Sequence, residues 1–210
     1  MAQSKILYKI GRVVCFPVYK LLYRYKVINR SAIPDDGKGY LIACNHLSFS
    51  DPVLLGLCQK RPIYFMAKSD LFRNKFFGGL IKSLGAFPVE RGAGDGKATD
   101  TGGELLNQGN LLTIFIEGAR SKTGELMRPR SGAALVALQT GASVVPVCIT
   151  VVGNPKRLFS KRVIHFGEPM TVEELGLVSG DRRELKHASE KMMGRIKEFR
   201  EQDLSEYKRS

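Results

Sequence analysis

Residues 40–52 read YLIACNHLSFSDP, and the change of character along this stretch decides the fold class. Its first five letters are apolar, as expected of a strand that is covered on both faces of a sheet. Polar residues follow, and Pro52 suits the first turn of a helix. A strand that turns directly into a helix is the unit of α/β proteins, which expose functional groups at such junctions. The stretch therefore predicts an α/β fold with a candidate site after residue 44.

The same alternation of apolar runs and helical patterns continues along the chain. We expect strands at 40–44, 63–67, 86–89, 111–116, 144–152 and 163–166. We expect helices at 52–60, 74–84, 98–108 and 132–140, and a further amphipathic helix that carries Leu185, Ala188, Met192, Ile196 and Phe199. With 210 residues, the chain suits one core rather than two. The pattern predicts a single α/β domain with a mixed, largely buried β-sheet flanked by helices.

Residues 1–33 differ in composition from the domain expected at 34–210. Seven basic residues and no acidic one lie between Met1 and Pro34. Apolar residues fall on one helical stripe and cations on the other side, and Pro17 splits the pattern into two short amphipathic helices. Such helices bind anionic membranes, at about 1 kcal/mol per Lys or Arg. We therefore expect membrane contact, with packing onto the domain as the alternative.

The net charge of +13 predicts an anionic partner: nucleic acid, a phospholipid surface or a phosphorylated substrate. We find no recognisable nucleic-acid-binding motif, so we expect no nucleic acid partner. The four cysteines show neither a CxxC pair nor zinc-ligand spacing, which indicates a reducing compartment and no metal site. The sequence also lacks a membrane-spanning run and a signal-peptide pattern. We expect a peripheral protein on the cytoplasmic face of a membrane.

His46 and Asp51 form the first candidate site, just after the strand at 40–44. Histidine suits the role of a base near neutral pH, and a nearby carboxylate can orient the ring and stabilise its cation. Asp51 has an alternative role as the cap of the following helix, and this spacing alone is a weak signal. Ser48 and Ser50 fit loop or cap positions better than the role of a nucleophile, because neither lies in a G-x-S-x-G turn.

Cations at other strand ends form the second candidate site. Glu117, Gly118 and Arg120 follow one strand, where an arginine fork suits bidentate phosphate binding and glycine permits close approach. Glu117 could hold the arginine in place. Lys68 and Arg91 follow two further strands, and both could converge with Arg120 on one anion. The alternative for each residue is an ordinary solvated surface charge.

Four ordered blocks of this sequence resemble those of the glycerolipid acyltransferase family. They are Asn45-His46 with Asp51, Phe87 to Gly92, Phe115 to Ser121, and Val144-Val145-Pro146-Val147. The resemblance runs from about residue 40 to 167, and it is strongest to the short bacterial branch that acylates 1-acylglycerol 3-phosphate. Ile116 and Ala119 stand where the third block of the family usually has Pro and Thr. The ordered set is far more specific than any block alone.

The resemblance implies a role for each candidate residue. His46 corresponds to the catalytic base and Asp51 to the carboxylate that orients it. The residues that correspond to those serving the acceptor phosphate are Lys68, Arg91, Glu117, Gly118 and Arg120. Pro146 lies in the block linked to the acyl-binding side.

The resemblance also implies the reaction. A fatty acyl group would pass from an acyl carrier protein or coenzyme A thioester to the sn-2 hydroxyl of lysophosphatidic acid, giving phosphatidic acid, with no metal and no further cofactor. Two alternatives stay open at this point. One is another acceptor, such as glycerol 3-phosphate or a different lysophospholipid, and the other is a non-catalytic basic module that binds membranes.

Overall fold

The computed structural model describes residues 5–89, 96–153 and 159–208, which fold around one β-sheet. Seven strands in these ranges lie in the order β1-β7-β6-β2-β5-β3-β4. They are β1 (Lys26–Ile28), β2 (Tyr40–Cys44), β3 (Ile63–Lys68), β4 (Ala86–Val89), β5 (Leu111–Phe115), β6 (Val144–Val152) and β7 (Lys161–Phe166). Neighbouring strands run parallel except β6 and β7, which are antiparallel. The prediction of a single α/β domain with a mixed sheet is confirmed.

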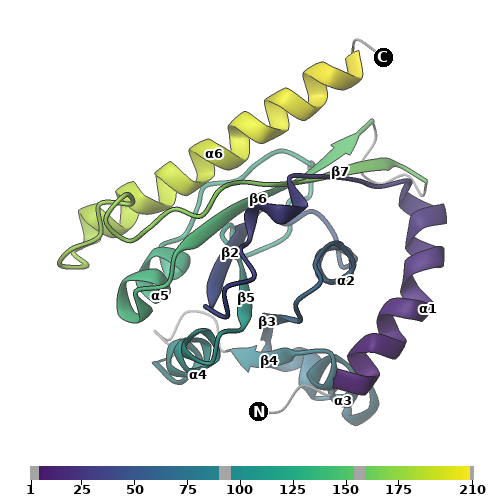
Figure 1. Cartoon of the computed structure of the whole chain (residues 1–210), viewed down its shortest axis with the longest axis horizontal. Helices are drawn as coiled ribbons and strands as arrows, with labels where there is room; N and C mark the ends of the chain where they lie inside the picture. Colours follow the sequence, from purple (N-terminus) through teal and green to yellow (C-terminus); the bar gives the residue numbers. More distant parts are fainter. Residues whose placement is uncertain (1–4, 90–95, 154–158, 209–210) are drawn as a thin grey trace.

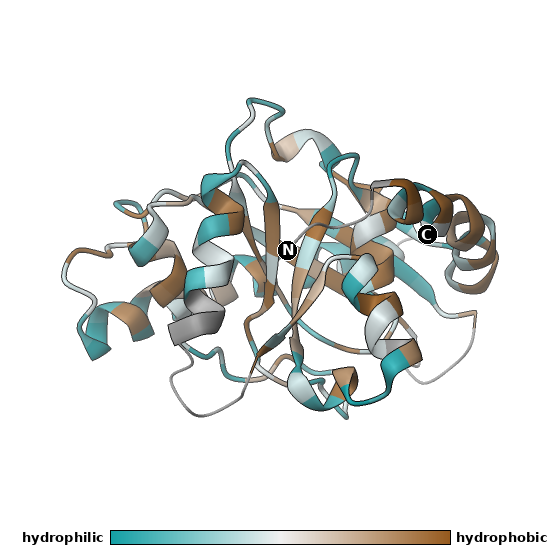
Figure 2. Ribbon diagram, turned by 90° about the horizontal axis from the view of Figure 1, so that it is seen from below, coloured by the Kyte–Doolittle hydropathy of each residue, from teal (hydrophilic) through white to brown (hydrophobic). Residues whose placement is uncertain are grey.

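Helices cover both faces of the sheet (Figure 1). They are α1 (Lys5–Tyr23), α2 (Asp51–Cys58), α3 (Lys75–Ser83), α4 (Gly96–Asn107), α5 (Gly132–Thr140) and α6 (Arg182–Lys208), with short 3-10 helices at Arg30–Ala32 and Ser69–Phe72. Alternate residues of β2 point to opposite faces. Leu41 and Ala43 pack in the core beneath α4, α5 and α6, while Ile42 and Cys44 pack beneath α2. Figure 2 shows apolar residues concentrated on the inner strands, which explains why β2 is apolar throughout.

The N-terminal segment forms one helix, so the prediction of two short helices was wrong. Helix α1 continues through Pro17, although an interior proline costs about 3 kcal/mol. Contacts on both sides of the proline hold the helix to the domain. Before it, the Tyr8 hydroxyl donates to the Gly56 carbonyl at 3.3 Å and the Arg12 guanidinium donates to the Gln59 carbonyl. After it, the Tyr23 ring packs on the Arg162 guanidinium of β7, whose carbon lies 4.1 Å from the ring centroid.

The sequence did not predict two further features near the ends of the chain. Strand β1 adds to the sheet by parallel pairing with β7, but three residues are too few to show a period of two. Helix α6 extends to Lys208, beyond Phe199, the last apolar position of the predicted helix. Every helix in the described ranges falls short of the length or the apolar character that a bilayer-crossing segment needs.

The four cysteines are free thiols in two different settings. Cys44, Cys58 and Cys148 are buried, and burial raises the pKa of Cys58 and of Cys148 to about 12. The pKa of Cys44 is also raised by burial. Cys15 on α1 is partly exposed.

Candidate active site

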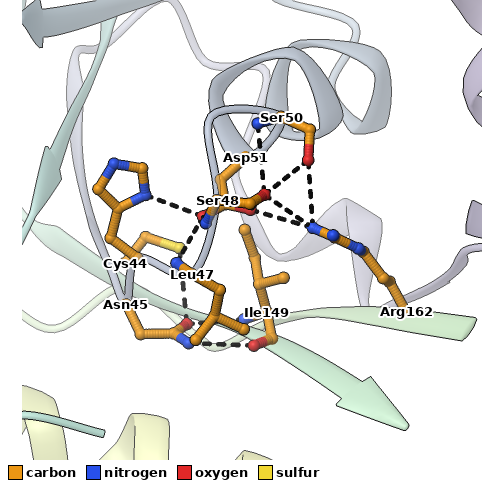
Figure 3. A network of polar contacts seen from close by, with 9 residues as sticks. Cys44, Asn45, Leu47, Ser48, Ser50, Asp51, Ile149 and Arg162 are labelled. Carbon is orange, nitrogen blue, oxygen red and sulfur yellow. Dashed lines mark hydrogen bonds and ion pairs between the residues drawn. The ribbon is translucent and has the colours of Figure 1, made fainter. Parts of the chain in front are cut away.

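The end of β2 is fixed from both sides before the chain reaches His46. The Asn45 side chain bonds to β6 twice: it donates to the Ile149 carbonyl at 3.0 Å and accepts the Ile149 N–H at 2.8 Å (Figure 3). On the other side, the Ser121 N–H donates to the His46 carbonyl at 2.8 Å. The backbone that carries His46 is therefore held between its two neighbouring strands.

The predicted pair of His46 and Asp51 is formed. The Nδ1–H of His46 donates to Oδ2 of Asp51 at 2.8 Å, and the carboxylate is fully buried. The same oxygen accepts the backbone N–H groups of Leu47 at 2.6 Å and Ser48 at 2.7 Å. The imidazole ring stacks on Phe115 with centroids 3.8 Å apart. With Nδ1 held by the carboxylate, Nε2 is the nitrogen left to exchange a proton with a substrate.

Asp51 does not cap α2, which was its alternative role. It is the first residue of the helix, and Ser50 occupies the cap position without a side-chain cap bond. The carboxylate instead turns back to the loop before the helix, where its second oxygen, Oδ1, accepts the Ser48 hydroxyl at 2.7 Å. The buried Arg162 guanidinium also donates to Oδ1, at 3.2 Å. Nothing in the local sequence pointed to Arg162.

His46 opens into a groove of about 2550 Å³ between helices α1, α2 and α3 and the strand ends. Helices α2 and α3 and strand β3 supply the apolar lining, which includes Val53, Leu57, Phe65, Leu80 and Ile81. The end of β3, the loop after β5 and the start of α6 supply cations, which include Lys68, Arg120, Lys122, Arg128, Arg130 and Arg182. The groove therefore suits a molecule with an apolar chain and an anionic group.

Three of the residues predicted to bind phosphate line this groove together with His46: Lys68, Gly118 and Arg120. Gly118 has a φ of +71°, and a Cβ there would lie 2.6 Å from the Arg130 side chain, so the turn requires glycine. The Arg120 guanidinium lies 3.5 Å from the centroid of the Phe49 ring. Lys68 pairs with Asp70. Arg91, the third cation predicted, lies outside the described residues.

Glu117 lies beneath the groove and does not pair with Arg120, contrary to our expectation. Its side chain is buried, and Oε1 accepts the Met127 N–H at 3.4 Å. Among the described residues, Oε2 has no hydrogen-bond partner, and no ion pair joins Glu117 to Arg120. Burial raises the pKa of Glu117 to about 7. The carboxyl group therefore supports the loop that follows β5, while Arg120 points to the groove side of that loop.

The Acyltransferase family model matches residues 24–150, which include the end of β2, the groove loops and most of β6. This chain belongs to the acyltransferase family. A 1-acyl-sn-glycerol-3-phosphate acyltransferase of Bacillus subtilis is 33% identical over 177 residues, 83% of this chain and 87% of that protein. One of Streptococcus pneumoniae is 29% identical and matches 70% of this chain, which spans 56% of its length. The crystal structure of the 1-acyl-sn-glycerophosphate (LPA) acyltransferase PlsC from Thermotoga maritima shares the fold, with a TM-score of 0.71, 22% identity, and coverage of 94% of this chain and 78% of that one.

Within the described ranges, no three His, Cys, Asp or Glu residues gather as metal ligands would. Sequence reasoning missed Phe115, which stacks on His46, and Phe49, which stacks on Arg120. Both aromatic residues belong to the blocks that carry the resemblance, so their position was a usable signal. Arg162 carried no such signal, because it is one of 33 Lys and Arg residues and lies beyond the last block.

Glu117→Gln should stabilise the acyltransferase relative to wild type increasingly as pH rises from 5 to 8. The pKa of Glu117 is raised from 4.5 to about 7, so the fold favours the protonated acid. Its contribution to stability is complete below about pH 4.5 and is lost as pH rises through about 7. Glutamine stays neutral and avoids this loss. Thermal melts of both proteins across the range measure the difference, and Glu125→Gln, exposed on the same loop, is the control. A difference that stays constant with pH contradicts the expectation.

Proposed function

We propose that this acyltransferase moves a fatty acyl group from an acyl carrier protein or coenzyme A thioester to the sn-2 hydroxyl of 1-acylglycerol 3-phosphate. The product is phosphatidic acid, a precursor of phospholipids. The observation that carries the proposal is the His46–Asp51 pair, which opens into a groove with an apolar wall and a cationic rim. The names of the bacterial relatives support the same acceptor.

In the proposed mechanism, Nε2 of His46 takes the proton of the acceptor hydroxyl as its oxygen attacks the thioester carbonyl. Asp51 holds the Nδ1–H and stabilises the imidazolium that forms. The tetrahedral intermediate then collapses, the carbon–sulfur bond breaks, and the thiolate leaves and takes a proton from the imidazolium. Transfer is direct, because the Ser48 hydroxyl is engaged by Asp51 and the Cys44 thiol is buried with a raised pKa.

Arg120 and Lys68 bind the phosphate of the acceptor in this proposal, and the predicted partner Arg91 joins them. Both described cations line the groove that contains His46. A guanidinium fork binds phosphate oxygens in pairs and so fixes the direction of the lipid. Holding the phosphate places the free hydroxyl beside the base, which lowers the entropic part of the barrier.

Arg120→Ala should raise the KM for the acceptor by about 10- to 100-fold, the value of a hydrogen bond to a charged group. The KM for the thioester should change little, because Arg120 is assigned to the other substrate. Initial rates at varied acceptor concentration measure the effect. Arg195→Ala removes the same charge from α6, outside the groove, and serves as the control. An unchanged acceptor KM would remove Arg120 from the phosphate site.

A thiol-release assay tests the function itself. The purified protein is given palmitoyl coenzyme A or palmitoyl acyl carrier protein together with 1-acylglycerol 3-phosphate, glycerol 3-phosphate or lysophosphatidylcholine. We expect thiol release and phosphatidic acid with the first acceptor. A clear preference for either of the others overturns the proposed acceptor. Binding to liposomes without any loss of thioester points to a membrane-binding module instead.

The exposed face of α1 is proposed to bind the cytoplasmic surface of the membrane as a peripheral contact. Tyr8 and Arg12 face the domain, whereas Ile6, Val13 and Leu21 are 71%, 74% and 71% exposed. An apolar helix face of this size is uncommon on a protein that meets water alone. No described residue of α1 is acidic, which favours anionic lipid.

Replacing Ile6, Val13 and Leu21 together by Asp should reduce binding to phosphatidylglycerol vesicles at least about tenfold, because apolar burial is lost and negative charge is added. Cosedimentation with vesicles measures binding. Substitution is preferable to truncation at residue 30, since truncation also removes β1. Val178→Asp makes one such change at a site 83% exposed but far along the chain from α1, and should bind normally. Undiminished binding of the triple variant contradicts the assignment.

A further inference from the structure

Arg162 on β7 is a buried cation that contacts the loop carrying the catalytic pair. Its Nη1 donates to Oδ1 of Asp51 at 3.2 Å, to the Ser48 hydroxyl at 3.0 Å and to the Ser50 hydroxyl at 3.2 Å (Figure 3). Only 3% of the residue is exposed. Removing a guanidinium from water costs several kcal/mol unless an opposite charge receives it. Asp51 is that charge, so the two residues depend on each other.

The fold brings Arg162 to this place from β7, the strand next to the edge strand β1. Arg162 pairs in register with Val151 of β6, two strands away from β2. The Tyr23 ring at the end of α1 covers the guanidinium, whose carbon lies 4.1 Å from the ring centroid. The cation is thus enclosed between an aromatic face and a carboxylate, and water is excluded from the back of the catalytic pair.

The two oxygens of Asp51 have separate partners. Oδ2 accepts His46 Nδ1–H and two backbone N–H groups, whereas Oδ1 accepts the Ser48 hydroxyl and Arg162. Backbone groups and a hydroxyl supply only partial charges, so Arg162 supplies the one full positive charge that touches the carboxylate among the described residues. A neutral Asp51 could not stabilise the imidazolium form of His46.

We propose that Arg162 is a positioning residue, which pairs with the buried Asp51 carboxylate and fixes its rotation so that Oδ2 faces His46. This inference rests on the proposed role of His46 as the base. Arg162 acts through Asp51 and touches no substrate, because it does not line the groove.

Other titratable groups also face the catalytic pair. Glu117 from the loop after β5 and Cys44 from β2 interact electrostatically with Asp51. Tyr19 of α1 interacts electrostatically with both Asp51 and Arg162. These groups are present in wild type and in any Arg162 variant. A difference between the two pH–rate profiles therefore reports the missing guanidinium and not the titration of its neighbours.

Arg162→Met should lower kcat by about 10- to 100-fold, as loss of a partner behind a catalytic ligand commonly does. Both KM values should stay within about threefold, since the groove is untouched. The cation no longer opposes protonation of the His46–Asp51 pair, so the acid limb of kcat/KM should move to higher pH, by up to about one unit. Arg162→Lys restores the positive charge without the guanidinium fork. This variant should return the acid limb of the kcat/KM profile to its wild-type pH but restore only part of kcat.

Two further variants separate positioning from simple folding support. Asp51→Asn with Arg162→Met should have the kcat of Asp51→Asn alone, because Arg162 acts through that carboxylate. Arg200→Met breaks an arginine–carboxylate contact of 2.8 Å with Glu125. It should leave kcat and the acid limb of the kcat/KM profile unchanged. Melting temperatures are recorded for all variants.

An Arg162→Met protein with wild-type kcat and an unmoved acid limb overturns the inference, whatever its melting temperature. If His46→Ala also keeps full activity, the assigned base is wrong. If His46→Ala is inactive while Arg162→Met is normal, only the role of Arg162 fails.

Discussion

Replacing His46 by Ala should lower kcat by about 10²–10⁴-fold, the range that general-base catalysis contributes. The substitution removes the proton acceptor from the groove. It leaves in place the two hydrogen bonds between Asn45 and Ile149 and the backbone bonds at the end of β2. The fold and both KM values should therefore change little. Steady-state rates of thiol release measure kcat, and near-normal turnover by the purified variant would refute the role.

The chain contains its own control for this experiment. Nδ1–H of His165 on β7 donates to the Asp203 carboxylate at 3.1 Å, and the ring stacks on Phe199 with centroids 4.2 Å apart. The His165 and His46 side chains are both 14% exposed, yet His165 does not line the groove. His165→Ala should keep wild-type kcat, because a paired histidine without access to substrate has no proton to exchange with it.

Asp51→Asn should be the most damaging single change, because it affects both catalysis and stability. An amide cannot stabilise the imidazolium, so kcat should fall by about 10²–10⁴-fold. Its NH₂ group would also face donors that now converge on a carboxylate, and Arg162 would lose its counter-charge. Breaking a buried pair of this kind costs about 3–5 kcal/mol of unfolding free energy. Denaturant unfolding and thiol release together measure both effects.

Asp203→Asn is the matched control for Asp51→Asn. Asp203 is also buried, and it accepts the Thr150 hydroxyl at 2.6 Å as well as His165. Its substitution should destabilise the contact of α6 with the sheet while kcat of the folded protein stays normal. An Asp51→Asn variant that loses only stability, as Asp203→Asn should, contradicts the assignment of Asp51 to the reaction.

The sheet and most helices could be predicted because their hydrophobic patterns are long enough to read. Each strand and helix expected between residues 40 and 166 matches an observed one within two residues at either end. Strand β1 has three residues and lies at an edge, so its burial comes from β7 rather than from its own pattern. Helix α1 continues through Pro17 because tertiary contacts on both sides of the proline, from Tyr8 to α2 and from Tyr23 to β7, outweigh the local preference to break.

Whether a residue of the site could be predicted depended on its distance along the sequence from the other site residues. His46 and Asp51 are five residues apart at one strand-to-helix junction, so a local motif revealed them. Arg162 is 111 residues from Asp51 and reaches it only through the sheet order, which no local pattern encodes. Glu117 and Arg120 lie in one short motif, and the sequence could not show that the turn at Gly118 sends one side chain inward and the other to the groove.

The distribution of thiols makes the protein suitable for fluorescent labelling without mutagenesis. Cys44, Cys58 and Cys148 are buried with raised pKa values, whereas Cys15 lines the groove on α1. A maleimide dye at neutral pH should therefore attach at Cys15, beside the groove that contains His46. Its emission would report when a lipid chain displaces water there, during turnover and in real time.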